Sequence, residues 1–294
     1  MHYVITGSLG NTGKPITEGL VKAGHTVTVI TSKQETAAKI ETLGATAAVG
    51  DLADAAFVTT AFANADAVYL MIPPKFDTTD WRGDQNRISD SYMAAIRAND
   101  IRFAVVLSSI GAHKGQLTGP IDGLYDLEQK LQAIAGLNVK ALRPSYFMQN
   151  LHAMAGMVKG MGIMGSNFGD DQVVLVHTSD IAAVALDELL RLDFTRFQVR
   201  YIAGDEKTGA EIARILGSAV GKPETPWIVF SDEQNTQGML QAGLSEEIAT
   251  KYTEMGVAIR DGSMQADYMN NRPTPGKVKL VDFAKNEFAP AYQA

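Results

Sequence analysis

Short β-branched and apolar runs alternate with stretches of helical periodicity along the first half of the chain. The helical stretches carry apolar residues at offsets of three and four, as at Ile16, Leu20 and Ala23. The apolar runs predict strands at 2–6, 26–31, 46–49, 67–72, 103–108 and 138–143. Helices are predicted between them, at 13–24, 34–43, 54–63, 81–99 and 122–135.

This alternation predicts an α/β fold, a doubly wound parallel sheet of the Rossmann type. Right-handed crossovers place the carboxyl ends of all the strands at one edge of the sheet, and ligands bind there. After residue 150 the pattern becomes less regular, with a glycine–methionine segment and several amphipathic helices. We therefore expect a Rossmann domain over 1–150 and a smaller C-terminal α+β lobe over 151–294, packed on the same cleft.

A glycine-rich turn, "TGSLGNTG", lies between the first predicted strand and the first helix. Glycines allow positive φ and close approach of a ligand to the backbone, and a helix N-terminus attracts anions. We predict that the turn holds the pyrophosphate of a dinucleotide, through Gly7, Ser8, Leu9, Gly10, Asn11, Thr12 and Gly13. The spacing is GxxGxxG, not the GxGxxG of the dehydrogenase fingerprint, and a turn without a ligand is the alternative.

Composition narrows the classes of function. Of the 294 residues 46% are hydrophobic and 20% charged, which is ordinary for a soluble globular protein. A net charge of −7 argues against nucleic-acid and anionic-membrane partners, and the lack of cysteine excludes thiolate chemistry. No histidine pattern indicates a metal. No signal peptide or membrane-spanning segment is evident, so we expect a cytoplasmic protein. Nothing in the sequence argues against a homo-oligomer.

Five more motifs accompany the glycine turn: "GDL" at 50–52, "VVLSSIGA" at 105–112, "GLNVKALRPSYFMQNL" at 136–151, "VHTSDIAAVAL" at 176–186 and "RPTPGKVKLVDFAKN" at 272–286. Together they resemble the NmrA-like branch of the atypical short-chain dehydrogenase/reductases over nearly the whole chain. The resemblance implies an NAD(P)-binding Rossmann domain and a small C-terminal lobe that closes a substrate cleft. That branch contains NAD(P)H-dependent quinone and azo-type reductases and also redox-sensing regulators.

The choice of cofactor depends on the second predicted strand. NAD-preferring sites carry an acidic residue about 20 positions beyond the glycines. Here Thr31, Ser32 and Lys33 stand at that position, and they suit the 2′-phosphate of NADP. We therefore favour NADP(H) over NAD(H). The alternative is that Lys33 is an ordinary solvated lysine, and nearby Glu35 weakens the preference for NADP(H).

Other cofactor contacts are predicted after later strands, at Asp51, Leu52, Ile72, Pro73, Pro74 and Tyr146. Asp51 matches the family position beside the adenine, and as an alternative or in addition it caps the helix that follows.

The Tyr-x-x-x-Lys pair of short-chain dehydrogenases is missing. Tyr125 is followed four residues later by Gln129, and Lys130 lies about 140° round the helix from Tyr125. Ser108 and Ser109 remain at the strand edge, where they bond the nicotinamide ribose, a substrate oxygen or simply the strand end. The candidate catalytic residues are thus Tyr125, Ser108 and Ser109.

This absence favours one kind of reaction. Reducing a ketone requires a positioned acid, whereas a quinone accepts hydride to give a stabilised anion that water can protonate. We therefore expect a small hydrophobic, quinone-like or otherwise conjugated acceptor. A non-catalytic NADP(H) sensor that acts through a partner protein is the rival. An apolar acceptor wall is predicted from Phe147, Met148, Asn150, Met154 and Phe168, with ordinary core packing as the alternative for the methionines.

Overall fold

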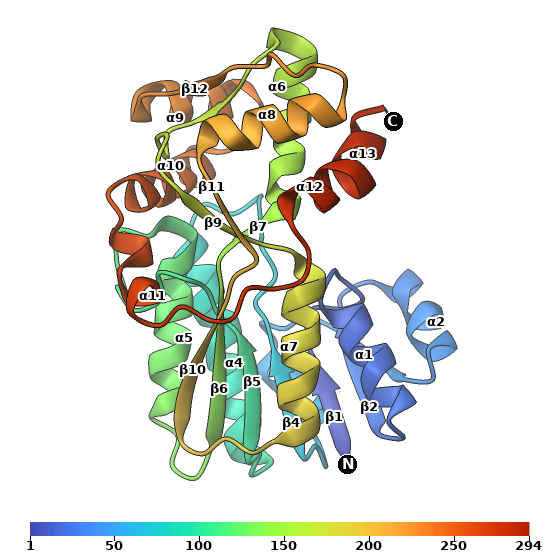
Figure 1. Ribbon diagram of the computed structural model, residues 1–294. Coiled ribbons are helices and arrows are strands. Elements are labelled where there is room, and N and C mark those ends of the chain that lie inside the picture. The colour runs from blue at the N-terminus through green and yellow to red at the C-terminus, as the bar shows by residue number, and fades with distance from the viewer. Residues whose placement is uncertain (294) are drawn as a thin grey trace.

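The computed structural model describes residues 1–293, and its centre is a seven-stranded parallel sheet (Figure 1). The strand order is β10-β6-β5-β4-β1-β2-β3, with β1 and β4 at the point where the direction of winding reverses. The strands are β1 (His2–Ile5), β2 (Thr26–Thr31), β3 (Thr46–Val49), β4 (Ala67–Leu70), β5 (Phe103–Leu107), β6 (Asn138–Pro144) and β10 (Phe197–Ile202). The predicted Rossmann sheet is confirmed, and all six predicted strands are present.

Helices cover both faces of the sheet. One face carries α1 (Gly13–Lys22), α2 (Gln34–Thr42) and α7 (Thr178–Arg191), and the other carries α3 (Ala55–Ala61), α4 (Trp81–Ala98) and α5 (Asp122–Gln132). Successive side chains of β1 point to opposite faces: Tyr3 and Ile5 pack with α1, whereas Val4 packs on the α4 side. Strands buried on both faces are apolar throughout, which explains why they were recognisable.

The seventh strand was not predicted. β10 pairs with β6 in parallel from Phe197 opposite Val139 to Ile202 opposite Pro144. It is an edge strand, and its polar and exposed positions weaken the apolar pattern. Before β10, helix α7 lies beside α1 (Figure 1), in contact through Gly19 and Leu186. The chain thus returns to the Rossmann layers after residue 150, and a boundary there does not separate the two lobes.

The smaller C-terminal lobe has two short sheets and a set of helices above the carboxyl edge of the main sheet (Figure 1). Its strands are β7 (Tyr146–Phe147), β8 (Met164–Ser166), β9 (Val173–Val176), β11 (Asp205–Lys207) and β12 (Trp227–Val229). Its helices are η2 (Met148–Ala153), α6 (Met154–Met161), α8 (Gly209–Ala219), α9 (Asp232–Gln241), α10 (Glu246–Arg260), η3 (Ser263–Gln265), α11 (Ala266–Asn270), α12 (Leu280–Phe283), η4 (Ala284–Phe288) and α13 (Ala289–Gln293).

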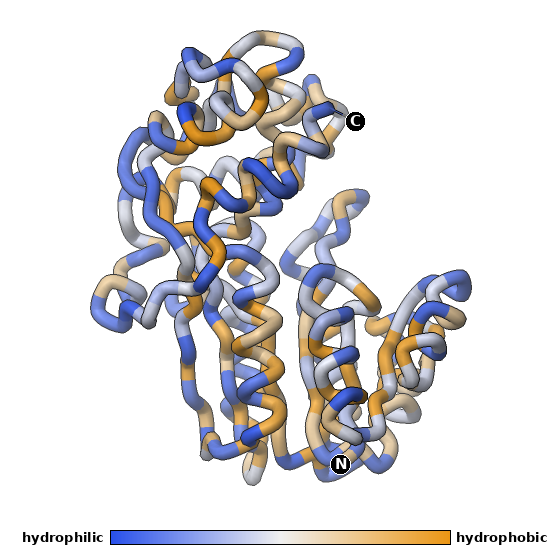
Figure 2. Tube along the Cα trace, turned by 45° about the vertical axis from the view of Figure 1, so that its right-hand side comes forward, coloured by the Kyte–Doolittle hydropathy of each residue, from blue (hydrophilic) through white to orange (hydrophobic). Residues whose placement is uncertain are grey.

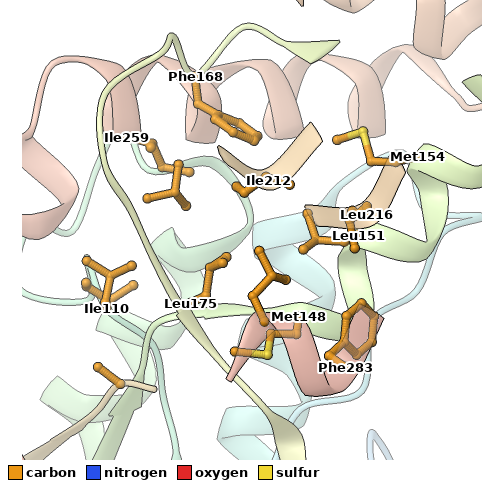
Figure 3. Packing of buried hydrophobic residues seen from close by; sticks show 14 of the residues in the cluster. Ile110, Met148, Leu151, Met154, Phe168, Leu175, Ile212, Leu216, Ile259 and Phe283 are labelled. Atoms are coloured by element: carbon orange, nitrogen blue, oxygen red, sulfur yellow. The ribbon is translucent and has the colours of Figure 1, made fainter. Parts of the chain in front are cut away.

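Each lobe has its own apolar interior. Figure 2 shows apolar (orange) segments in both lobes. In the smaller lobe, residues from η2, β9, α8 and α12 point toward one another, among them Leu151, Leu175, Leu216 and Phe283 (Figure 3). Within residues 1–293, every helix is either too short or too polar to cross a membrane.

Candidate active site

Two glycines of the turn after β1 are required by the fold itself. Gly7 has φ of +87°, and a Cβ there would lie 2.4 Å from the side chain of Met71. At Gly13, where α1 begins, a Cβ would lie 2.2 Å from the carbonyl oxygen of Ser8. Any side chain at either position would collide with its neighbours.

Gly10 differs from these two glycines. It is exposed, it lacks a positive φ, and a Cβ would meet only the Gly7 carbonyl oxygen, at the ordinary contact distance of 3.5 Å. The protein therefore has room for a side chain there, so a ligand is the better reason for a glycine. The first turn of α1 carries no acidic residue and Thr12 gives it no side-chain cap, so no side chain offsets the positive dipole end of the helix, which suits an anion.

A cavity of about 840 Å³ opens beside this turn, at the carboxyl ends of β1 to β4. Nine predicted cofactor residues line it: Gly7, Ser8, Thr31, Ser32, Asp51, Leu52, Ile72, Pro73 and Pro74. The other seven do not: Leu9, Gly10, Asn11, Thr12, Gly13, Lys33 and Tyr146. The volume suits a nucleotide cofactor, and the position is the switch point at which Rossmann proteins bind it.

The end of β2 is held in place by hydrogen bonds. The buried Thr31 hydroxyl accepts hydrogen bonds from the Ser8 hydroxyl (3.0 Å) and from the Lys33 N–H (3.2 Å). Lys33 itself is exposed, at the N-cap of α2.

The Asp51 carboxylate lies beside the cavity and accepts a hydrogen bond from the Ala53 N–H at 2.9 Å. The alternative role of Asp51 as a helix cap is wrong, because Asp54 is the residue that caps α3.

Sequence reasoning missed one wall of the cavity. This wall follows β4 and comprises Lys75, Thr78, Trp81, Asp84, Gln85, Arg87 and Ile88. Lys75 and Arg87 both pair with Asp84, whose pKa is held below its usual range by the Thr78 hydroxyl and by Arg87. Two cations against one carboxylate leave this wall positive by one charge, which suits a phosphorylated ligand. The wall follows a strand at the carboxyl edge, and that position was its only signal.

Ser108 belongs to a buried polar network and does not face the cavity. Its hydroxyl donates to Glu128 on α5, and the same carboxylate accepts two hydrogen bonds from Arg143, at 2.6 and 3.0 Å. Burial disfavours the charged guanidinium of Arg143, but the bonds to Glu128 outweigh it and raise the pKa of Arg143. Arg143 also donates to the Tyr201 hydroxyl on β10 (3.1 Å) and to Asp267 on α11 of the smaller lobe (3.2 Å). The Ser108 proton is thus committed to a network that ties the two lobes together.

Ser109, the other predicted serine, is half-buried, and its hydroxyl forms no hydrogen bond with residues 1–293. Tyr125 lies against Gly115 in the β5–α5 connection and does not line the cavity. Lys130 donates to Asn86 and Asp90 on α4, at 2.7 and 2.6 Å. The Lys130 ammonium is thus bound to α4 and gives Tyr125 no partner.

The predicted acceptor wall is partly wrong. Met148, Met154 and Phe168 are 0%, 6% and 4% exposed and belong to the core of the smaller lobe (Figure 3). The glycine–methionine segment after residue 150 forms α6 and β8, whose buried apolar side chains belong to the same core. The remaining two residues, half-buried Phe147 and exposed Asn150, keep their predicted role as a proposal.

Known proteins share this arrangement. A model of the NAD(P)H-binding family matches residues 7–190. NAD(P)H azoreductase of Xenophilus azovorans is 23% identical over 252 residues, 86% of this chain and 85% of that protein. NADPH-dependent quinone oxidoreductase QOR2 of Escherichia coli superposes with a TM-score of 0.79 at 20% identity, over 97% of this chain and 99% of the other. Triphenylmethane reductase of Citrobacter sp. superposes with a TM-score of 0.74 at 18% identity, over 99% of this chain and 100% of the other.

The structural likenesses establish the Rossmann fold, and the family model spans the glycine turn, the cavity and helix α7. The predicted resemblance is confirmed, and the chain belongs to the NAD(P)H-binding family.

Proposed function

We propose that this protein is an NADP(H)-dependent oxidoreductase that reduces a quinone-like or other conjugated, hydrophobic acceptor. One observation carries the proposal: the cavity at the switch point is lined by the start of the glycine turn, and the Lys130 ammonium is bound to α4 and forms no pair with Tyr125. The relatives named as azoreductase, quinone oxidoreductase and triphenylmethane reductase support an acceptor of this class.

Different residues in and beside the cavity would bind different parts of the cofactor. The turn around Gly10 and the N-terminus of α1 would hold the pyrophosphate, and Asp51 with Leu52 would flank the adenine. Thr31, Ser32 and Lys33 would hold the 2′-phosphate, which makes NADP(H) the favoured cofactor. When bound in its reduced form, the cofactor supplies a hydride.

The acceptor needs orientation more than acid catalysis. A quinone that receives a hydride becomes a hydroquinone monoanion and takes its second proton from water, while the cofactor is left oxidised. Two of the side chains that could act as acids near β5 are engaged elsewhere, since Ser108 donates to Glu128 and Lys130 to α4. Holding the acceptor close to the cofactor is then the main contribution of the protein.

The test is steady-state oxidation of NADPH with a panel of quinones, beside calorimetric titration with NADPH. We expect turnover of at least about 1 s⁻¹ with some members of the panel. Tight NADPH binding without turnover on any acceptor would contradict the proposal. It would favour a non-catalytic NADP(H) sensor, which does not need a Tyr–Lys pair either.

A further inference from the structure

Three aromatic rings meet where the cavity wall after β4 touches the smaller lobe. Phe76 lies in the β4–α4 connection, Trp81 is the first residue of α4, and Tyr252 comes from α10. Their ring centroids lie 5.9 Å (Phe76–Trp81), 6.3 Å (Phe76–Tyr252) and 6.2 Å (Trp81–Tyr252) apart. Edge-on and tilted rings at such distances attract one another. We call these three residues the aromatic triangle.

One corner of the triangle is anchored. Trp81 is 5% exposed, its indole N–H donates to the Pro120 carbonyl at 3.1 Å, and its backbone N–H donates to Glu247 at 2.9 Å. Trp81 also lines the dinucleotide cavity, as do Lys75 and Thr78 on either side of Phe76. The triangle therefore has a fixed base at the border between the cofactor and the smaller lobe.

The second corner is open. The Phe76 ring is 51% exposed although Trp81 and Tyr252 both lie against it. Lys75 and Asp77, its polar neighbours in the chain, are exposed too. An exposed aromatic ring that is backed by two others, at the border of a cofactor cavity, offers a flat apolar face to a flat ligand.

The third corner adds a polar group. The Tyr252 hydroxyl forms no hydrogen bond with any residue from 1 to 293. Burial raises the pKa of Tyr252, so the hydroxyl stays protonated and able to donate. Burial raises the pKa of Tyr146 as well, and Tyr252 raises it further. Tyr146 begins β7 just beyond the carboxyl end of β6, the edge of the sheet at which Rossmann proteins bind ligands.

On the basis of the proposed function, we propose that the aromatic triangle is the binding site for the acceptor ring. A flat conjugated ring stacks on the open face of Phe76, and the Tyr252 hydroxyl donates a hydrogen bond to a carbonyl oxygen of that ring. Trp81 supports Phe76 from behind and joins the acceptor site to the cofactor cavity. The site thus selects flat aromatic carbonyl compounds over aliphatic ones.

Tryptophan fluorescence tests this proposal without turnover. The chain has two tryptophans, so Trp227→Phe leaves Trp81 as the only one. This variant is saturated with NADP⁺ and titrated with 2-methyl-1,4-naphthoquinone, and we expect saturable quenching of Trp81. Adding Phe76→Ala should weaken quinone binding about tenfold, and Phe76→Leu, which keeps an apolar group without a flat face, should weaken it less. NADPH affinity should not change.

The matched variants separate the two contacts. Tyr252→Phe should weaken binding of the naphthoquinone several-fold but not that of 2-methylnaphthalene, which lacks a carbonyl. Val281→Ala, at an equally exposed apolar residue on α12, should have no effect. Trp227 donates to the Gly169 carbonyl, so Trp227→Phe alone can perturb the smaller lobe. We therefore repeat the comparison of the Phe76 and Tyr252 variants by calorimetry with the same naphthoquinone in protein that retains Trp227.

Unchanged quinone affinity in Phe76→Ala would overturn the proposal and leave the triangle as packing between the lobes. Turnover with quinones in that same variant would then show that the proposed function survives and the site lies elsewhere. Quenching that depends on Phe76, without turnover on any acceptor, would instead uphold the site and refute the reductase function.

Discussion

The glycine turn after β1 and the polar cluster around Glu128 on α5 lie in the same Rossmann domain but use polar groups in opposite ways. At the turn, Gly10 is exposed and no side chain caps the start of α1. Around Glu128, the Ser108 hydroxyl and the Arg143 guanidinium are buried and bonded to the same carboxylate. The comparison indicates a protein built to hold and orient a cofactor, in which the Ser108 proton at the end of β5 is committed to the buried cluster.

The largest expected effect comes from breaking the Glu128 cluster. Glu128→Ala removes the main partner of the buried Arg143 charge and leaves it only the partly exposed Asp267 at 3.2 Å. We therefore expect the free energy of unfolding to fall by about 3 kcal/mol in denaturant titrations, the lower end for a broken buried pair. Asp90→Ala is the control, because its pair with Lys130 is exposed and should be worth at most about 1 kcal/mol. A stable Glu128→Ala protein that had lost its turnover would make the cluster catalytic instead of structural.

Next in size is the substitution of Gly10 compared with that of Gly13. Gly10→Val should lower NADPH affinity at least about 100-fold, or about 2.8 kcal/mol, with an unchanged melting temperature, because the added side chain meets only ligand space. Gly13→Val should lower the melting temperature itself, because its Cβ would clash with the Ser8 carbonyl. Calorimetry and thermal unfolding of both variants check the contrast, and unchanged NADPH affinity in Gly10→Val would refute the cradle.

A smaller effect is expected at the end of β2. Lys33→Ala should weaken the binding of NADPH by about 1.5–3 kcal/mol and leave the binding of NADH almost unchanged, because only NADPH carries the 2′-phosphate. Lys39→Ala, at another exposed lysine of α2, is the matched control. Should both cofactors weaken equally, or neither, Lys33 has no part in the site and the cations after β4 become the candidates.

The smallest effect is expected at Tyr125. Tyr125→Phe should lower kcat with a quinone by less than tenfold, well below the roughly 10²–10⁴-fold loss of a general acid. The reason is that Lys130 is bound to Asn86 and Asp90 and cannot activate this hydroxyl. A collapse of kcat with normal NADPH binding would restore Tyr125 as a proton donor.

Sequence patterns predicted the Rossmann half well because its strands are apolar throughout and its helices are periodic. They missed β10 because an edge strand with exposed Gln198 and Val199 resembles a loop. The buried pair of Glu128 and Arg143 was also missed, since such residues are usually on the surface and nothing local marks the exception. The methionines of η2 and α6 were assigned to a substrate wall because a core and a pocket wall have the same composition.

The pH dependence of hydride transfer tests most directly whether orientation alone serves the reaction. The measurement is the single-turnover rate of NADPH oxidation by a saturating quinone between pH 6 and 9. We expect a flat profile, because neither the Ser108 cluster nor Lys130 supplies a free acid or base to the acceptor. A bell-shaped or steeply sloping profile that persists at saturating cofactor and acceptor would contradict this and require a titrating catalytic residue in the cleft.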